Sequence, residues 1–444
     1  MSRVPRANLT GNERRVVEEI DRQQEDLVTL TSDLIGFDTT AYEIGGPRRD
    51  EARLQEHLAR RLGALGAETE VWEPAPQDLA GSRLVPPGLR FDGRPQMFAR
   101  VGGSGGGRSL LLNGHIDVVS SEPRELWTSD PNRAQVRAGR LYGRGAIDMK
   151  GGIAAMVFAA ETLIRLGVRL AGDLLICTVT DEESTGAGGA AAVAHGVSAD
   201  AAIVTEASGF DVWTACRGSL IPTITVQGRA GHAGMAPPHW TEGGAVNAIE
   251  KMSVVIQALQ RLQEEWRTRP DHRHPHLSPG DIVPTVISGG EWMVTIPSSC
   301  RLTYHVAYLP GHADADGWGT TVEREIADWV DRAARSDPWL ADHPPTIEWG
   351  PDVPSAEIPP EHPIVQVMLD AGAAVGRPGR ATGFDNWHDG ATFTRFGGTP
   401  SICFGPSDIR LAHAVDESVP VADLVACAQA IALGALRFCG EVGQ

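Results

Sequence analysis

The sequence has few cysteines, no cysteine pairing motif and too few cations for its carboxylates. Its six cysteines are scattered over 444 residues without a CxxC pair, which argues against a disulfide framework and against a structural zinc site. We expect small buried thiols in a reducing compartment. The excess of acidic residues gives a formal net charge of -18. This argues against nucleic acid or an anionic membrane as the main partner, because both would repel the protein.

We also identify no long apolar run in the sequence of the kind found in secretory signals and membrane spans. Residues 1–24 lack the apolar core of a secretory signal, and no run approaches the length that spans a membrane. We therefore expect a cytoplasmic protein with no membrane partner. With 42% apolar residues, 51 Gly and 30 Pro, the chain is globular and rich in loops. It is too long for a single ordinary core, which suggests two or three domains.

The stretch LLLNGHIDVV, residues 110–119, predicts the central strand of a parallel sheet, because an unbroken apolar run indicates burial on both faces. His115 and Asp117 are two residues apart, so they project from the same side of an extended backbone. A carboxylate at this spacing can orient a histidine that binds metal or acts as a base. Open α/β sheets bind their ligands beyond the carboxyl ends of such strands.

Strands and helices alternate after this stretch. A helix rich in small residues follows GRGAIDMKGG and ends at Gly167, and a second helix at residues 188–195 lies between strands at 173–180 and 201–205. This order predicts a parallel sheet with crossover helices. The ends of its strands bring four candidate ligands to one edge: His115, Glu182, Glu183 and Glu206.

The pattern changes near Arg217 and returns after Pro338, which indicates an inserted domain. We predict an α/β domain formed by residues 1–215 and 337–444, with a mostly parallel sheet and helices on both faces. Residues 216–336 would form an inserted α+β domain, since their strands and long amphipathic helices do not alternate regularly.

Two loops could carry chemistry of their own. GGSGGG, residues 102–107, matches the GxSxG nucleophile elbow formally, but that motif needs a helix after it and here a strand follows. We expect a flexible hairpin loop. Residues 269–281 contain three closely spaced histidines that could bind a metal, yet the surrounding prolines favour a solvated loop.

Five residues at or beyond strand ends form the candidate metal centre: His115, Asp148, Glu183, Glu206 and His413. Zinc accepts such nitrogen and oxygen ligands, with cobalt or manganese as substitutes. The five are too many for one tetrahedral site with an open position, and enough for two metals that share a carboxylate. Glu182 and Glu183 diverge on an extended backbone, so one can bind metal while the other acts as a base. Each residue alone would be read as a surface acid or a core histidine.

The motifs NGHIDVV, GRGAIDMKGG, TDEESTGAGG, GRAGHAGMAP and FGPSD with LAHAVDESVP resemble, in this order, those of the M20 metallohydrolases. The sequence is most similar to the acetylornithine deacetylase and succinyl-diaminopimelate desuccinylase branch, from about Leu30 to the C-terminus. The resemblance implies a zinc-exopeptidase-like fold, a homodimer, and an inserted domain that serves as dimerisation or lid domain.

The resemblance also implies a role for each matching residue. Asp117 would support the first ligand, Glu182 would be the general base, and His232 would stabilise the oxyanion from the partner subunit. The metal ligands follow the same correspondence: His115 and Glu206 on the first metal, Glu183 and His413 on the second, and Asp148 bridging both.

The sequence departs from the family where the substrate is recognised. Val294 and Ala307 occupy positions at which the family's lid commonly has Asn and Arg. Trp387 and His388, in TGFDNWHDGATF, suggest a pocket unlike that of an acetylornithine enzyme. Arg410 is either a carboxylate anchor or an exposed structural arginine.

We therefore expect a two-metal amidohydrolase that cleaves the amide of a small N-acyl amino acid or a related N-acyl compound. A metallo-exopeptidase or dipeptidase could use the same centre. A binding protein without turnover would be expected to have lost metal ligands, and none of the five is missing.

Overall fold

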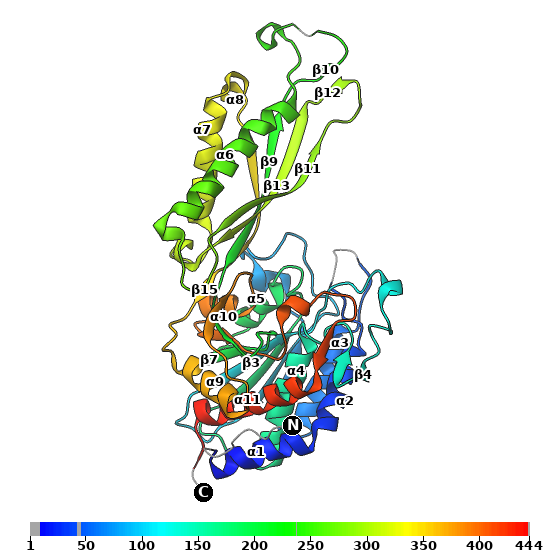
Figure 1. Cartoon of the computed structure of the whole chain (residues 1–444), viewed down its shortest axis with the longest axis vertical. Coiled ribbons are helices and arrows are strands. Elements are labelled where there is room, and N and C mark those ends of the chain that lie inside the picture. The colour runs from blue at the N-terminus through cyan, green and yellow to red at the C-terminus, as the bar shows by residue number, and fades with distance from the viewer. Residues whose placement is uncertain (1–8, 42–45, 237, 443–444) are drawn as a thin grey trace. The chain divides into compact units, whose positions relative to one another are not determined.

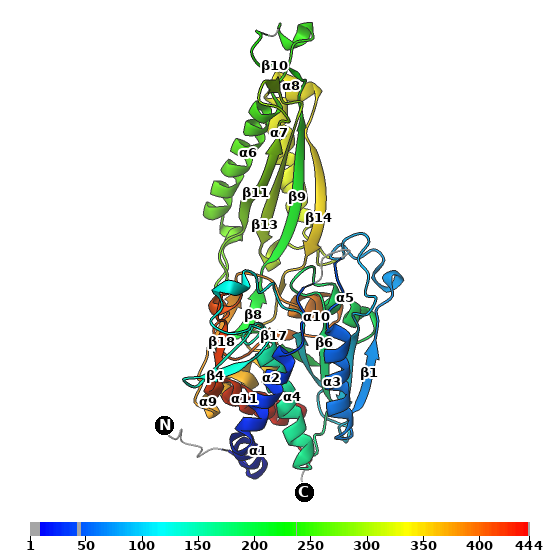
Figure 2. The same cartoon turned by 90° about the vertical axis from the view of Figure 1, so that its right-hand side faces the viewer.

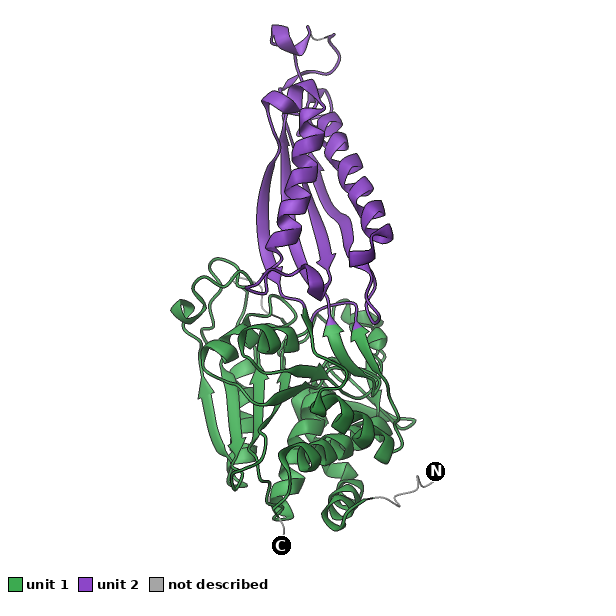
Figure 3. Ribbon diagram, turned by 90° about the vertical axis from the view of Figure 1, so that its left-hand side faces the viewer, with its two compact units in different colours: residues 1–215, 356–383, 388–444 green, residues 216–355, 384–387 purple. Residues whose placement is uncertain are grey.

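The computed structural model describes residues 9–41, 46–236 and 238–442. The chain forms two compact units (Figure 3). Unit 1 comprises Met1–Ala215, Ala356–Gly383 and His388–Gln444, and unit 2 comprises Cys216–Ser355 and Phe384–Trp387.

Unit 1 is built on a nine-stranded sheet in the order β1-β2-β6-β3-β7-β17-β8-β15, with β16 paired to β8. The four central strands, β6, β3, β7 and β17, are parallel to one another, whereas β2 and β8 pair antiparallel with their neighbours. The predicted fold class is confirmed at the centre of the sheet, and the outer strands make the sheet mixed. The strands are β1 (Glu68–Trp72), β2 (Gln96–Val101), β3 (Leu110–His115), β6 (Leu174–Val179), β7 (Ala201–Val204), β8 (Val212–Cys216), β15 (Ala356–Glu357), β16 (Ala381–Phe384) and β17 (Ser401–Cys403).

The loop at residues 102–107 joins β2 to β3, so a strand does follow it, but the expected hairpin is wrong. Strand β6 pairs with both β2 and β3 and therefore lies between them. The glycines of the loop are needed for close packing instead. A Cβ on Gly107 would lie 2.3 Å from the backbone nitrogen of Gly172, and one on Gly103 would lie 2.5 Å from the Gly172 carbonyl carbon.

Helices cover both faces of the sheet, as the sequence predicted (Figures 1 and 2). Gln55 of α3 bonds to Thr178 of β6, and Arg61 of α3 pairs with Glu161 of α4, so α3 and α4 share a face. On the opposite face Ala192 of α5 and Phe393 of α10 pack on the sheet. The helices of unit 1 are α1 (Gly11–Arg22), α2 (Gln24–Ile35), α3 (Glu51–Gly63), α4 (Lys150–Arg165), α5 (Ala187–Ala194), α9 (Pro363–Ala374), α10 (Gly390–Phe396) and α11 (Val421–Cys439).

Helix α11 corrects the expectation that no apolar run approaches membrane-spanning length. It has 19 residues with a mean hydropathy of 1.6, long and apolar enough to cross a membrane. Most of it is buried inside unit 1, where it packs against α4 and α9. Its many alanines allow this close helix packing. A core helix that is apolar all round has the same length and hydropathy as a membrane span.

Unit 2 is an antiparallel sheet in the order β11-β13-β9-β14, with α6 and α7 supplying the other side of its core. Trp266 of α6 and Tyr304 of β13 are among its largest buried side chains. A short pair, β10 with β12, places His232 opposite Thr295. The elements are β9 (Gly218–Gln227), β10 (Gly231–His232), β11 (Asp281–Gly289), β12 (Thr295–Ile296), β13 (Ser299–Tyr308), β14 (Thr346–Val353), α6 (Ala248–Thr268), α7 (Thr320–Arg335) and α8 (Pro338–Asp342).

The six cysteines are all buried and free, as expected from their apolar surroundings: Cys177, Cys216, Cys300, Cys403, Cys427 and Cys439.

Candidate metal centre

The carboxyl ends of three parallel strands converge at the candidate site. Strand β3 ends at His115, and the segment after β6 carries Glu182 and Glu183. Strand β7 is followed by Glu206. Because these strands are parallel neighbours, their ends lie at one edge of the sheet. Asp148 comes from the turn before α4.

His115 lies at the centre of a buried carboxylate cluster. Its Nε2 atom is 3.0 Å from Oδ1 of Asp148, 3.4 Å from Oε1 of Glu206 and 3.7 Å from Oε2 of Glu182. The His115 side chain is 1% exposed. Ligand atoms of His115, Glu182 and Glu206 therefore lie close enough together to hold one metal ion.

A second group of ligands shares Asp148 with the first. Nε2 of His413 lies 3.2 Å from Oδ2 of Asp148 and 3.2 Å from Oε1 of Glu183. The His413 side chain is 51% exposed, so this side of the centre is open to solvent within unit 1. Asp148 thus directs one carboxylate oxygen to each histidine, which is the arrangement of a carboxylate shared between two metals.

Asp117 joins two of the segments that meet at the centre. Its carboxylate accepts the backbone N–H groups of Glu182, at 3.2 Å, and Glu183, at 3.0 Å. Nδ1 of His115 donates to the carbonyl oxygen of Asp117 at 2.9 Å, and the Asp117 carboxylate is 3.6 Å from the same nitrogen. The carbonyl therefore orients the ring, while the carboxylate fixes the loop that presents the two glutamates.

Burial dominates the electrostatics of the carboxylates. It raises the pKa of Glu206 to about 7, together with the nearby Asp148 charge, and it raises the pKa of Glu182 well above its usual range. For Asp148, burial is outweighed by hydrogen bonds from His115 and His413, which hold its pKa below the ordinary value. Burial opposes a charge on His115, yet Glu182, Asp148 and Glu206 raise the pKa of its ring.

This donor set fits divalent cations. Two imidazoles and four carboxylates converge, and within the described residues no lysine or arginine side chain bonds to Glu182, Glu183 or Glu206. So much buried negative charge needs positive charge for stability. Zinc, cobalt and manganese all accept imidazole and carboxylate ligands.

The sequence interpretation missed Glu417 and Arg144, which position Asp148. One oxygen of Glu417 accepts the N–H groups of Ile147, at 2.7 Å, and Asp148, at 3.2 Å. Its other oxygen lies 2.6 Å from Arg144. Both residues lie inside motifs that the sequence had singled out, GRGAIDMKGG and LAHAVDESVP, and their charges were the available signal.

Asp389 was missed as well. It is 1% exposed, and neither carboxyl oxygen has a hydrogen-bond partner among the described residues. Burial, together with the nearby charges of Asp117 and Glu206, raises the pKa of Asp389 to about 8 although His115 opposes this. It follows His388 in the loop whose sequence departs from the family pattern.

The three candidate substrate-binding residues, Arg410, His388 and Trp387, differ in how far they are exposed to solvent. Arg410 is 85% exposed and pairs with its neighbour Asp408. His388 is buried, its Nδ1 accepts the N–H of Gly390, and burial lowers its pKa to about 4. The indole nitrogen of Trp387 is buried and has no hydrogen-bond partner within the described part of the chain.

His232 belongs to unit 2, whereas the five metal-ligand candidates belong to unit 1. His232 is exposed. The carbonyl of Val294 accepts the N–H of Ala233, so Val294 lies beside His232 on the paired segments. Ala307 is buried in β13, opposite Asp281.

Known proteins resemble this chain over most of its length. The model of the peptidase family M20/M25/M40 matches residues 111–436. An N-formyl-4-amino-5-aminomethyl-2-methylpyrimidine deformylase of Halalkalibacterium halodurans is 30% identical, covering 92% of this chain and 94% of its own. A succinyl-diaminopimelate desuccinylase of Xanthomonas oryzae is 32% identical, covering 90% of this chain and 96% of its own.

Solved structures show the same fold. A dinuclear metal-binding peptidase of Bacillus subtilis superposes with a TM-score of 0.61 at 14% identity, covering 94% of this chain and 98% of its own.

Proposed function

Because the chain belongs to the peptidase family M20/M25/M40, we propose that its buried centre holds two metal ions and removes an acyl group from a small N-acylated amine. The protein is an amidohydrolase, as are the deformylase and desuccinylase that it resembles along their length. The observation that carries the proposal is the position of Asp148, whose two oxygens each face one histidine.

The first metal would be held by His115 and Glu206, the second by Glu183 and His413, and both by Asp148. We propose zinc, since two imidazoles and several carboxylates are common zinc ligands, with cobalt or manganese as substitutes. When bound, the two ions supply Lewis-acid polarisation of the amide carbonyl and lower the pKa of the attacking water. The name of the Bacillus subtilis peptidase, which records two metals, supports this count.

Glu182 would serve as the general base. Its Oε2 atom lies 3.7 Å from Nε2 of His115. Because the proposed ligand sets of both metals leave Glu182 out, its carboxylate would be available to take a proton from the attacking water and pass it to the leaving nitrogen. Asp117 would keep Glu182 in place through its backbone N–H. His232 would donate a hydrogen bond to the developing oxyanion, acting from the partner subunit.

We propose an uncharged, short acyl group, with formyl preferred to succinyl. Support comes from the apolar residues Val294 and Ala307, which offer no cation to a substrate carboxylate, and from Arg410, which is already paired with Asp408. The Halalkalibacterium halodurans relative acts, by its name, on an N-formyl compound. Rates on N-formyl, N-acetyl, N-succinyl and N-carbamoyl amines test this. A higher kcat/KM for N-succinyl than for N-formyl substrates would contradict it.

A second candidate function is that of a metallo-exopeptidase or dipeptidase, which the family description favours. The proposed two-metal centre could cleave the amide of an N-acyl amine or the peptide bond of a dipeptide. Dipeptides in the same substrate panel separate the two candidates, because a dipeptidase needs a free amino or carboxyl terminus that an N-formyl amine lacks.

We propose that the protein acts as a homodimer joined through unit 2. Strand β11 is at the edge of its sheet, and an unpaired edge strand is suited to pairing with a second copy. Val286 is 62% and Ile287 57% exposed on this strand, which is unusual for apolar side chains that contact only water. The enzyme would act on small molecules in the cytoplasm. Its net charge of -18 disfavours nucleic acid and anionic membranes as partners.

A further inference from the structure

The histidine-rich segment of unit 2 is not the fully solvated loop expected from its prolines. His272 ends a short 3-10 turn, η4 (Pro270–His272), and is 1% exposed. Its ring faces that of His312, which ends a similar turn, η5 (Pro310–His312). The ring centroids are 4.1 Å apart, and Trp266 stacks on His272 at 4.7 Å. The expectation of a solvated loop is therefore wrong at His272.

The ring nitrogens of His272 and His312 are buried, although the His312 side chain as a whole is 13% exposed and interacts with the backbone of Asp271. Among the described residues, neither nitrogen of His272 has a hydrogen-bond partner, and neither nitrogen of His312 makes a hydrogen bond of ordinary geometry. Each neutral imidazole carries an N–H donor and an acceptor nitrogen, so this burial is unfavourable unless a ligand satisfies them. Burial and the facing His312 lower the pKa of His272 to about 4, and burial also lowers that of His312. Both shifts favour the neutral ring, which is the form that binds metals.

Asp271 supplies an oxygen beside the rings. Its Oδ2 atom is 3.9 Å from Nε2 of His312, and ligand atoms of Asp271, His272 and His312 all lie within 4.8 Å of one another. Atoms bound to one zinc ion at ~2.1 Å in a tetrahedron are ~3.4 Å apart. The side chain of Asp271 is 53% exposed, so it can rotate by the small amount that this requires.

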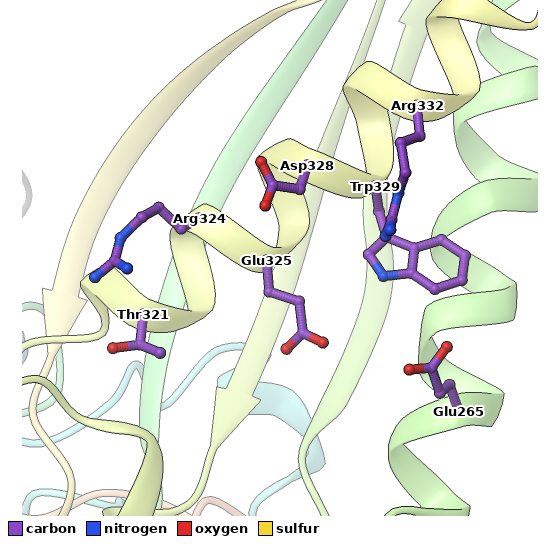
Figure 4. Close-up of a pocket in the computed structure, with 7 residues that line it drawn as sticks. All are labelled: Glu265, Thr321, Arg324, Glu325, Asp328, Trp329 and Arg332. Atoms are coloured by element: carbon purple, nitrogen blue, oxygen red, sulfur yellow. The ribbon is translucent and has the colours of Figure 1, made fainter.

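Charged neighbours keep the Asp271 carboxylate on the side of the two rings. Arg269 donates to both carboxylate oxygens of Asp271, at 3.2 and 2.6 Å, and also pairs with Glu325. Glu325 accepts the indole N–H of Trp266 at 3.2 Å. It also lines a polar groove between α6 and α7 (Figure 4). A carboxylate ligand fixed by an arginine is typical of metal sites, and Glu325 offsets the positive charge that Arg269 brings.

We propose that Asp271, His272 and His312 form a third metal site, which binds Zn²⁺ or Co²⁺ through two imidazoles and one carboxylate with solvent as the fourth ligand. The proline at the start of each turn limits backbone freedom, so the two histidines are presented in a defined orientation. The metal would join the segment after α6 to the segment after β13 and so stabilise unit 2. All three ligands belong to unit 2, separate from the catalytic ligands of unit 1.

Metal counting in the full-length enzyme tests the site. Metal-free protein is dialysed against Zn²⁺ and its content measured for wild type, His272→Gln, His312→Gln and a matched control, His276→Gln, which changes a half-buried histidine of the same segment. We expect wild type and His276→Gln to bind one Zn²⁺ per chain more than His272→Gln and His312→Gln. We also expect Zn²⁺ to raise the unfolding temperature of unit 2 less in those two variants. Equal zinc content in all four proteins would overturn the proposal.

A second measurement uses only wild type, so that a variant that fails to fold leaves the test intact. Crystals grown with Zn²⁺ are measured at the zinc absorption edge. We expect an anomalous peak between the rings of His272 and His312 and within bonding distance of Asp271. A map that has peaks at the catalytic ligands and none beside His272 would refute the third site and leave the catalytic centre unaffected.

Discussion

Oδ2 of Asp148 lies 3.2 Å from Nε2 of His413. The other oxygen of the same carboxylate lies 3.0 Å from His115. Asp148 can occupy this position because Glu417 accepts its backbone N–H and Arg144 fixes Glu417. Glu417 thus fixes the backbone from which the Asp148 carboxylate projects, and such positioning from outside the ligand set helps to orient a bridging ligand.

The first prediction concerns Glu182 and Glu183, which are adjacent in sequence but face different histidines. Glu182→Gln should keep both catalytic metals and lower kcat by about 10²- to 10⁴-fold, because the amide cannot accept a proton. Glu183→Gln, the matched control, should lose metal as well as activity. Metal content and steady-state kinetics of both variants check this. Near-normal kcat in Glu182→Gln would remove its role as base.

The second prediction concerns Asp117, whose carboxylate accepts two backbone N–H groups. In Asp117→Asn only the amide oxygen can accept, so one of the two part-buried N–H groups loses its partner. The loss of a hydrogen bond to a charged group costs about 1.5–3 kcal/mol. We expect a lower unfolding temperature and a reduced kcat, with KM little changed because Asp117 is fully buried. Thermal unfolding and kinetics measure the two effects. A variant with wild-type kcat would show that the glutamates do not depend on Asp117.

Central strands of unit 1 could be predicted from the sequence, whereas the order of the strands in the sheet could not. The buried run at Leu110–His115 and the alternation after it identified β3, β6 and β7, because periodicity is a local property. The position of β6 between β2 and β3 is a property of pairing between distant segments. The glycines of residues 102–107 therefore indicated a hairpin that does not exist.

The sites show the same division. The residues proposed as metal ligands could be named from motifs and strand ends, and five of them meet in unit 1. The burial of His272 could not be predicted from the sequence, because it depends on Trp266 and on His312, which is 40 positions further along the chain. Asp389 follows two candidate residues in the sequence, but its lack of hydrogen-bond partners is visible only in three dimensions.

The third prediction concerns His232, which lies in unit 2 while Glu182 lies in unit 1. His232→Ala should lose activity and keep its metals. If the histidine acts in the partner's site, mixing inactive His232→Ala with inactive Glu182→Gln should restore activity, because mixed dimers contain one intact site. Activity of the mixture after subunit exchange is the measurement. No recovery, with mixed dimers confirmed by mass, would mean that each site is built from one chain.

The fourth prediction concerns the exposed edge strand β11. Ile287→Asp places a charge on the apolar surface of this strand and should convert the dimer into monomers. Light scattering coupled to size exclusion gives the mass. Leu126→Asp, at an exposed apolar position of unit 1, is the matched control and should stay dimeric. A dimeric Ile287→Asp variant would place the interface elsewhere.

Two metal ions joined by Asp148 would carry the amidohydrolase activity of this chain. Metal-free enzyme in the His272→Gln background, which removes the third site, is titrated with Zn²⁺ while hydrolysis of an N-formyl amine is followed. We predict that activity rises until about two equivalents are bound per chain and that Asp148→Asn in the same background shows no such rise. Full activity without added metal, or an unchanged titration in Asp148→Asn, would show that hydrolysis does not depend on two metals joined by Asp148.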